Sequence, residues 1–298
     1  MVTTECPFSA EQIQFITDVC GCQARSITDI FPLTLGLTNI SWHFRVKDNE
    51  YVLRLPGEGS ELFIDRQAEM RALEVANDLG LDPTFLDGDA QRGWKISIYL
   101  AGSRTMNPRN PKEISDAMNR IRLLHDSGQH ISKSLEFSKE GLRYLDIMDR
   151  RNFVFPPEFE AIADRYAKVN NLVSLQSQKR VLCHNDCFDR NFLVHGNEML
   201  LIDWEYAGMA GYGQDLGTFV IASELTMEEA WLALEAYYSR VPTPEEKEHF
   251  LVHIAYSAWF WFCWSLLKEC LGDKLSQSSF YYRYAIDFLP KAESILGL

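Results

Sequence analysis

Three polar residues with the chemistry of a metal-dependent group transfer lie in the segment HNDCFDRNFLVHGNEMLLIDWE: Asp186, Asn191 and Asp203. A carboxylate and an amide oxygen are hard-oxygen ligands that suit Mg²⁺, and a second carboxylate can orient a hydroxyl and accept its proton. A single Asp at a strand end is more often a turn or capping residue. The prediction of phosphoryl transfer therefore depends on the whole set.

Two short apolar runs, NFLV and MLLI, predict a β-hairpin that positions this set. The turn between them is His195–Gly196–Asn197. Strand ends on the same side of such a hairpin are expected to bring Asp186, Asn191 and Asp203 within reach of one another. His184 is expected to brace the loop rather than to do chemistry.

The rest of the chain predicts an α+β fold with a β-rich first part and a helical second part. Residues 42–46 and 51–55 alternate apolar and polar side chains around the turn KDNE, which predicts an antiparallel hairpin. Residues 62–80 predict the one main helix of this part, ending at Gly80, and the pattern is mostly helical from Pro111 onward. The predicted boundaries are 1–100 for a nucleotide-binding lobe and 101–298 for a catalytic and substrate-binding lobe, with YLAGS as hinge.

The charge of the chain restricts its partners. Its formal net charge is −13 over 298 residues, which disfavours nucleic acid or an anionic membrane surface as the main partner and favours a small cation. The start of the chain lacks a basic region followed by an apolar core, and the run AYSAWFWFCWSLL is too short to span a bilayer comfortably. A cytoplasmic protein without membrane insertion is expected, and its oligomeric state is unknown.

The pattern H-x-D-x-x-x-x-N, followed by an apolar run and Ile-Asp, resembles the catalytic and metal loops of the protein-kinase-like phosphotransferases. The resemblance is to the choline/ethanolamine kinase family, especially its bacterial choline kinases, within the aminoglycoside phosphotransferase superfamily. It implies a bilobal kinase-like fold that uses ATP and Mg²⁺. It also implies that Asp186 is the catalytic base and that Asn191 and Asp203 bind the metal, with Asn191 counted among the catalytic residues as well.

The resemblance extends to the nucleotide site. The segment LGLTNISWHFRV is similar to the family's nucleotide-covering loop, and YVLRLPG places an arginine where choline kinases carry one. An Arg fork suits phosphate oxygens, and a glutamate on the next helix is expected to hold it in place. The resulting nucleotide-binding candidates are Gly36, Thr38, Asn39, Arg54, Glu69 and Tyr99.

The implied substrate is choline. DWEYAG resembles a segment of the bacterial choline kinases, in which Asp215 matches a structural Asp, and WFWFCWSLLKE resembles their helix with two Trp three residues apart. A quaternary ammonium is held by aromatic faces and nearby carboxylates. Each aromatic residue taken singly is more often part of a core, and Phe188 stands where many choline kinases carry Gln. The substrate candidates are Glu205, Tyr206, Glu224, Trp261, Trp264 and Tyr281.

Other functions stay open at this point. The alcohol could be ethanolamine, thiamine, a methylthiosugar or an aminoglycoside, although a primary amine would want more carboxylates than rings. A nucleotide-binding pseudokinase is a further alternative, against which stands the complete set Asp186, Asn191 and Asp203. A metal-dependent hydrolase lacks support because no His-rich ligand set is present in the sequence.

Overall fold

The computed structural model describes residues 6–33, 39–57, 59–175 and 179–272. The chain divides into two compact units. The first contains Met1–Arg104 and Val194–Tyr206, and the second contains Thr105–Leu193 and Ala207–Leu298. The helices and strands, with their short 3₁₀ turns, are α1 (Ala10–Cys20), η1 (Ala24–Ser26), β1 (Ile27–Leu33), β2 (Asn39–Val46), β3 (Asn49–Pro56), η2 (Ser60–Leu62), α2 (Arg66–Asp78), β4 (Phe85–Asp89), β5 (Trp94–Ile98), β6 (Arg104–Thr105), α3 (Pro111–Asp126), α4 (Phe137–Arg150), α5 (Phe159–Leu175), β7 (Arg180–Cys183), η3 (Asp189–Asn191), β8 (Phe192–His195), β9 (Glu198–Leu201), η4 (Trp204–Tyr206), β10 (Gly208–Gly211), α6 (Gly213–Ala222), α7 (Met227–Tyr238) and α8 (Pro244–Cys270).

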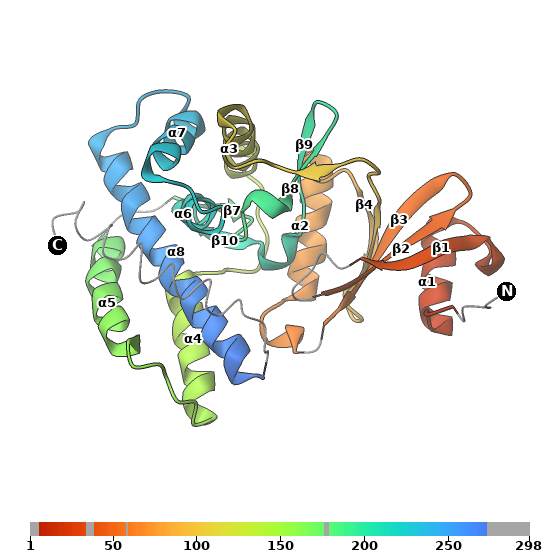
Figure 1. The fold of residues 1–298 in the computed structure, drawn as a ribbon, viewed down its shortest axis with the longest axis horizontal. Helices are drawn as coiled ribbons and strands as arrows, with labels where there is room; N and C mark the ends of the chain where they lie inside the picture. Colours follow the sequence, from red (N-terminus) through yellow and green to blue (C-terminus); the bar gives the residue numbers. More distant parts are fainter. Residues whose placement is uncertain (1–5, 34–38, 58, 176–178, 273–298) are drawn as a thin grey trace. The chain divides into compact units, whose positions relative to one another are not determined.

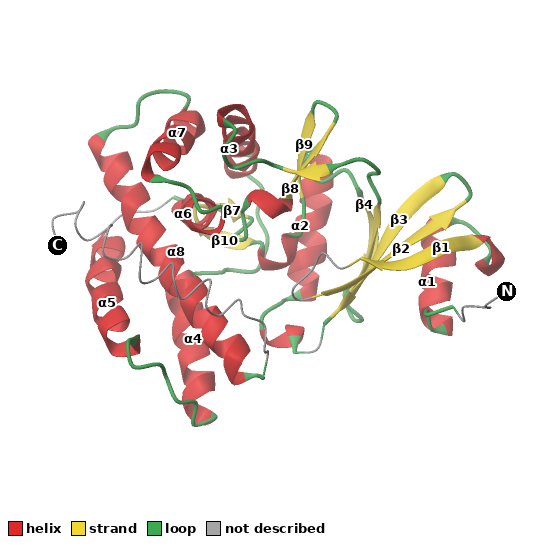
Figure 2. Ribbon diagram, in the orientation of Figure 1, coloured by secondary structure: helices red, strands yellow, loops and turns green. Residues whose placement is uncertain are grey.

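The first unit is built on a five-stranded sheet with the strand order β1-β2-β3-β5-β4 (Figure 2). Its pairs are antiparallel, and β2 and β3 form the predicted hairpin, with Trp42 opposite Leu53 and Ser41 opposite Arg54. Because side chains alternate along a strand, Leu53 and Arg54 must lie on opposite faces of the sheet. One face is therefore apolar and the other carries a buried cation.

Helix α1 covers the apolar face. Ser9 caps its first turn in a capping box, and Gly21 ends it in the left-handed conformation at φ 59°, as the sequence predicted. Ile16 of the helix packs with Phe44, Leu53 and Ile96 of the sheet, and all four are fully buried. This layer fixes β3 from one side, so that Arg54 is presented on the other.

Helix α2 lies on the Arg54 face. It begins later than the sequence indicated, because Asp65 accepts hydrogen bonds from the backbone N–H groups of Gln67 and Ala68 and so caps the first turn at Arg66. Glu69, Ala72, Leu73 and Ala76 share the buried face of the helix. This face places a carboxylate one turn into the helix.

A segment from later in the chain completes the first unit. Residues 194–206 include β9 and η4, and the backbone N–H of Leu201 donates to the carbonyl of Leu81 at 2.9 Å. The Trp204 indole N–H donates to the Leu201 carbonyl at 2.9 Å, and that side chain is fully buried. A division at residue 100 alone therefore omits the piece that carries Asp203 and Glu205.

The second unit is mostly helical, and α8 is its central element (Figure 1). Helices α4, α5 and α6 pack against it. Helix α6 crosses α8 so closely that a Cβ built on Gly217 would lie 2.2 Å from the backbone oxygen of His253. A two-stranded antiparallel sheet of β7 and β10 lies in the same unit and leads directly into His184.

Helix α8 is 27 residues long, and among the described residues it alone is long and apolar enough to cross a membrane, with a mean hydropathy of 1.4 over its apolar window. Every residue of that window is buried inside the protein. The helix is therefore packed as the core of the second unit. The predicted α+β fold, with an antiparallel sheet first and helices after it, is confirmed.

Candidate active site

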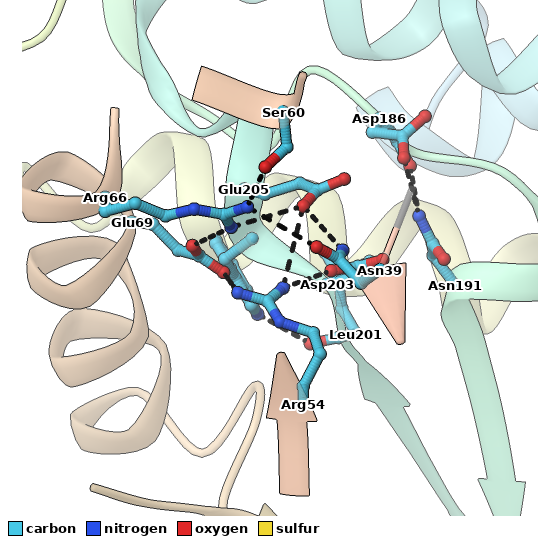
Figure 3. A network of polar contacts seen from close by, with 11 residues as sticks. Asn39, Arg54, Ser60, Arg66, Glu69, Asp186, Asn191, Leu201, Asp203 and Glu205 are labelled. Carbon is cyan, nitrogen blue, oxygen red and sulfur yellow. Dashed lines mark hydrogen bonds and ion pairs between the residues drawn. The ribbon is translucent and has the colours of Figure 1, made fainter. Parts of the chain in front are cut away.

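Arg54 and Glu69 form a buried ion pair in the first unit (Figure 3). Arg54 Nη2 donates to Glu69 Oε1, and the two residues are 5% and 1% exposed. Buried charges of this kind persist only when they are paired. The contact predicted between strand β3 and helix α2 is therefore present, with the guanidinium held rigidly on the polar face of the sheet.

Asp203 and Glu205 bring two further carboxylates to the same guanidinium (Figure 3). Arg54 Nη1 lies 3.0 Å from Asp203 Oδ1 and 3.7 Å from Glu205 Oε2. Asp203 has a side chain that is 34% exposed and a left-handed backbone at φ 68°, whereas Glu205 is 2% exposed. Non-glycine residues with positive φ are uncommon and concentrate at functional sites, which agrees with the role predicted for Asp203.

A second guanidinium completes the network. Arg66 Nη1 donates to Glu69 Oε2 at 2.8 Å and lies 3.5 Å from Glu205 Oε2. Its Nη2 faces Ser60 Oγ at 3.0 Å and Asn39 Oδ1 at 3.4 Å. Asn39 in turn donates its side-chain N–H to Glu205 Oε2 at 2.8 Å. Asn39, a predicted nucleotide-binding residue, thus contacts Glu205 through its amide N–H and Arg66 through its amide oxygen.

The charges of the network set its titration. Burial alone would raise the pKa of Glu69, but Arg54, Lys95 and Arg66 outweigh it and lower that pKa to about 2. Burial and the adjacent Asp203 carboxylate raise the pKa of Glu205 above its ordinary value. Burial opposes the charge of Arg54, but Glu69, Asp203 and Glu205 raise its pKa further. Arg54 is therefore a permanent cation among carboxylates.

Lys95 is a third buried cation on the same sheet face, opposite Arg54 in the pairing of β3 with β5. Burial and repulsion from Arg54 lower its pKa. Asp82, which is 1% exposed, accepts hydrogen bonds from both the backbone and the hydroxyl of Thr84. Lys95 and Asp82 thus extend the group of buried polar side chains around Arg54.

The carboxylates of this network fit a divalent cation. Glu69, Asp203 and Glu205 each offer an oxygen, and these atoms lie within 4.8 Å of one another. Glu69 is already paired with both guanidinium groups, which leaves Asp203, the most exposed of the three, as the best placed ligand. An oxygen donor set is what Mg²⁺ prefers in proteins.

In the second unit, Asn191 and Asp186 are brought together. The Asn191 side-chain N–H donates to Asp186 Oδ2 at 3.0 Å and to the Asp186 carbonyl at 2.9 Å. Asn191 closes the short turn η3, where its backbone N–H donates to the Phe188 carbonyl. Asp186 is half-buried and Asn191 is 7% exposed. Asp186 and Asn191, which are five residues apart in the sequence, thus lie together in one compact loop.

Asp215 on α6 holds this loop in place through hydrogen bonds to its backbone. Its carboxylate accepts the backbone N–H groups of His184 at 2.9 Å and Asn185 at 2.5 Å, and His125 Nε2 lies 2.9 Å away. Asn185 has a left-handed backbone at φ 65°. His184 Nδ1 accepts the backbone N–H of Asp186 at 3.3 Å, which is the bracing contact expected of it. Burial would raise the pKa of Asp215, but His125 and His184 lower it, so Asp215 stays ionised.

Trp261 and Trp264 lie on α8 with ring centroids 5.7 Å apart in an edge-to-face arrangement. They are 2% and 4% exposed. The Trp261 indole N–H donates to Thr218 Oγ1 at 3.3 Å, one turn along α6 from Asp215, and Lys268 Nζ lies 5.9 Å from the Trp264 centroid. Both tryptophans are thus well packed, and Trp264 has a face that already attracts a cation.

The remaining predicted site residues differ in their burial and in their contacts. Tyr99 is half-buried, with its ring edge-to-face on His43 at 4.8 Å. Tyr206 is 3% exposed, and Glu224 is exposed, with its carbonyl accepting from Arg109 at 2.7 Å. Gly36, Thr38 and Tyr281 lie outside the described residues.

Glu205 is the predicted substrate residue whose setting differs most from the expectation. The sequence suggested a carboxylate for an ammonium ion, whereas the structure surrounds it with Asn39, Arg54 and Arg66. Its negative charge is thus already compensated within the ion network. The motif DWEYAG could not reveal this, because the partners come from β2, β3 and α2.

Sequence reasoning missed Arg66 and Lys95. The signal for Arg66 was its position three residues before Glu69, which places both on one helical face. The signal for Lys95 was the alternation of WKISI, which puts it on the polar face of its strand. Both look like solvated charges when the chain is read one segment at a time.

Comparison with known proteins identifies the family and the fold of this chain. The family model described as choline/ethanolamine kinase matches residues 30–256. Protein LicA of Haemophilus influenzae is 24% identical over 274 residues, covering 87% of this chain and 98% of that protein. The crystal structure of choline kinase LicA from Streptococcus pneumoniae superposes with a TM-score of 0.81 at 22% identity, covering 95% of this chain and all of that one.

A spectinomycin phosphotransferase, solved with ADP and spectinomycin, has the same fold at a TM-score of 0.64 and 15% identity, covering 97% of this chain and 99% of that one. This similarity shows that the two proteins share a fold. Since the family model matches well over half of its length, the chain belongs to the choline/ethanolamine kinase family.

Proposed function

We propose that this protein is an ATP- and Mg²⁺-dependent kinase that phosphorylates the hydroxyl group of choline. The observation that carries the proposal is the Asp186–Asn191 loop, braced by Asp215, in a chain of the choline/ethanolamine kinase family. The buried Arg54–Glu69 pair adds the phosphate-binding cation that such a reaction needs.

The nucleotide would be held by the residues around Arg54. The Arg54 fork would contact phosphate oxygens, while Glu69 keeps it in place, and Asn39 would contribute an amide from the start of β2. Gly36, Thr38 and Tyr99 are further nucleotide contacts in this proposal. Asp203 and Asn191 would be the metal ligands, and Mg²⁺ would neutralise phosphate charge when it is bound.

The chemical step is an in-line displacement. The Asp186 carboxylate accepts a hydrogen bond from the choline hydroxyl and takes its proton as the oxygen bonds to the γ-phosphorus. The bond between that phosphorus and the bridging oxygen breaks, and ADP leaves with the electron pair. Asn191 holds the Asp186 carboxylate at 3.0 Å, so the base is oriented before the alcohol arrives.

The ammonium group of choline would be held by aromatic faces. Trp261 and Trp264 are the main candidates because a quaternary ammonium offers no N–H donor and is attracted to ring faces. Tyr206, Glu224 and Tyr281 are additional candidates, whereas Glu205 is assigned here to the ion network. A small cationic alcohol as substrate also agrees with the net charge of −13 and with a cytoplasmic protein.

The Asp186→Asn variant tests this mechanism. Turnover of choline should fall by about 10³-fold or more, because the base and its charge are lost, while Mg-ADP affinity measured by calorimetry should stay within about threefold. Asp189→Asn is a matched control, since this half-buried carboxylate lies in the same loop. Retained turnover in Asp186→Asn would overturn the assignment of the base.

A further inference from the structure

Arg66 is an unusual residue for the place that it occupies. It is the first residue of α2, where the positive end of the helix dipole disfavours a cation, and its side chain is only 11% exposed. A Cβ on Gly93 would lie 3.1 Å from Arg66 Nε, so the side chain is packed closely against the β4–β5 turn. A cation held in an unfavourable place suggests that its partners require it.

The fork of Arg66 separates two sets of partners. Nη1 faces carboxylates, with Glu69 Oε2 at 2.8 Å and Glu205 Oε2 at 3.5 Å. Nη2 faces neutral oxygens, with Ser60 Oγ at 3.0 Å and Asn39 Oδ1 at 3.4 Å. One planar group therefore joins η2, the start of β2, the first turn of α2 and the η4 turn (Figure 3). The planar fork of an arginine donates in both directions at once, with a fixed geometry that an ammonium group does not have.

The consequence concerns Arg54. Without Arg66, the Glu205 carboxylate would keep Asn39 but lose one of its two neighbouring guanidinium groups, and it would attract Arg54, which lies 3.7 Å away, more strongly. The same Arg54 nitrogen serves Asp203 at 3.0 Å. Arg54 would then be drawn toward Glu205 at the expense of its position beside Asp203 and the phosphate groups.

We propose that Arg66 is a positioning residue for nucleotide binding. It neutralises Glu205 and the second oxygen of Glu69. Arg54 can then leave Asp203 to contact phosphate oxygens, and Asp203 can leave Arg54 to bind the metal. Arg66 also fixes the side chain of Asn39. This inference rests on the proposed function, because it gives Arg54 and Asp203 their roles at the phosphate groups. Arg66 itself needs no contact with ATP.

The test compares Arg66→Met and Arg66→Lys with Arg71→Met. Arg71 lies on the same helix and pairs with Glu74 at the same i,i+3 spacing, but the pair is exposed and far less constrained. Each variant is assayed for kcat, for KM of ATP and of choline, and for Mg-ADP affinity by calorimetry. Thermal unfolding of each variant serves as the check on folding.

The expected result is selective. Arg66→Met should raise the KM for ATP and the Kd for Mg-ADP by about ten- to hundredfold, the loss typical of a charge-assisted contact. The KM for choline should stay within about twofold. Arg66→Lys should recover less than half of the loss on a logarithmic scale, because an ammonium group cannot serve both sides. Arg71→Met should match the wild type.

Some outcomes would overturn the proposal. Wild-type Mg-ADP affinity in Arg66→Met, or full rescue by Arg66→Lys, excludes a role for the fork. If Arg66→Met does not fold, Ser60→Ala and Arg66→Lys together replace it. Ser60→Ala removes one neutral acceptor of the Arg66 fork and keeps the charges of the network. Unchanged nucleotide affinity in both of these variants also overturns the proposal. Calorimetry needs no alcohol substrate, so an inactive wild type with intact Mg-ADP binding would count against the choline assignment alone.

Discussion

Glu69 is the carboxylate on which the position of Arg54 depends, and its ionisation has a measurable effect on the stability of the folded state. Burial would raise the pKa of Glu69, but Arg54, Lys95 and Arg66 together outweigh it and lower that pKa from 4.5 to about 2. A carboxylate with a depressed pKa stabilises the folded state above its unfolded pKa, and that contribution is lost as the pH falls. The window for this group therefore runs from about pH 4.5 down to about pH 2.

Glu69→Gln should accordingly lower the free energy of unfolding by about 3 kcal/mol at pH 7. The difference from the wild type should shrink as the pH falls below about 4.5. Urea unfolding at several pH values between 3 and 7 measures both effects. Glu74→Gln, at an exposed pair, should change stability by less than about 1 kcal/mol at any pH. A difference for Glu69→Gln that does not vary with pH would contradict the account.

Trp264 separates substrate binding from packing. If its face holds the choline ammonium, Trp264→Ala should raise the KM for choline about tenfold, as expected for a cation–π contact of about 1–2 kcal/mol. Trp259 on the same helix is stacked on Tyr166 at 4.5 Å, and its replacement by Ala should lower stability while the KM for choline stays unchanged. Steady-state kinetics and thermal unfolding of both variants decide. Equal effects of the two substitutions would assign Trp264 to the core.

The residue types of the site could be predicted from the sequence, but several partners could not. Asp186, Asn191 and Arg54 were predicted because each lies in a short motif, and Glu69 was predicted because it lies on the helix that follows the Arg54 strand. Arg66 and Lys95 were missed because their burial depends on strands and helices that are distant in the sequence. Glu205 had a motif but a different set of neighbours, since its three partners come from other elements.

At the scale of elements, the position of the Asp186–Asn191 loop depends on how closely α6 approaches α8. Asp215, which accepts the loop's backbone N–H groups, lies on α6 two residues before Gly217. A Cβ on Gly217 would meet the His253 backbone oxygen at 2.2 Å and Ser257 Oγ at 2.6 Å. Since backbone cannot yield as a flexible side chain can, α6 would have to shift and move Asp215 with it.

Gly217→Ala should therefore lower the free energy of unfolding by about 1–3 kcal/mol and reduce kcat, although alanine is the better helix former. Gly141→Ala is a matched control on α4, because its added Cβ would meet Trp259 of α8 at an ordinary 3.4 Å. The control should be neutral or slightly stabilising, with normal kcat. Chemical denaturation and kinetics of the pair are the measurements, and a stable, fully active Gly217→Ala would refute the argument.

Helix and strand boundaries show which signals in the sequence were sufficient. Ser9 and Gly21 bound α1 as predicted, because a capping box and a left-handed glycine act locally. Helix α2 starts at Arg66 and not at the apolar LFI before it, because the Asp65 side chain caps the first turn. The grouping of residues 194–206 with the first unit could not be predicted, since it depends on pairing such as that of Leu201 with Leu81.

At the scale of the whole molecule, ligand binding should appear as stability. Mg-ADP at about 100 times its Kd should add about 2.7 kcal/mol, which corresponds to a rise in Tm of roughly 5 °C or more. Chelating Mg²⁺ with EDTA should remove most of this rise. Asp203→Asn should remove the Mg²⁺-dependent part and keep the part due to ADP alone. A rise that is the same with and without Mg²⁺ in the wild type would contradict the metal assignment.

The fold class and the family were also predictable from the sequence, because the order of the motifs along the chain is the signature of the family. The family match over residues 30–256 confirms both the relation and the class of enzyme. The identity of the alcohol depends instead on a small group of rings and charges, of which Tyr281 lies outside the described residues.

The most direct test of the central claim is therefore the choice of alcohol. ADP release with Mg-ATP should be measured for choline, ethanolamine, thiamine, kanamycin and methylthioribose, and the phosphorylated product identified by mass spectrometry. The account predicts that choline has the highest kcat/KM, about tenfold or more above ethanolamine, since aromatic faces favour a quaternary ammonium. A higher kcat/KM with any other alcohol in the panel, or no turnover of choline, would contradict it.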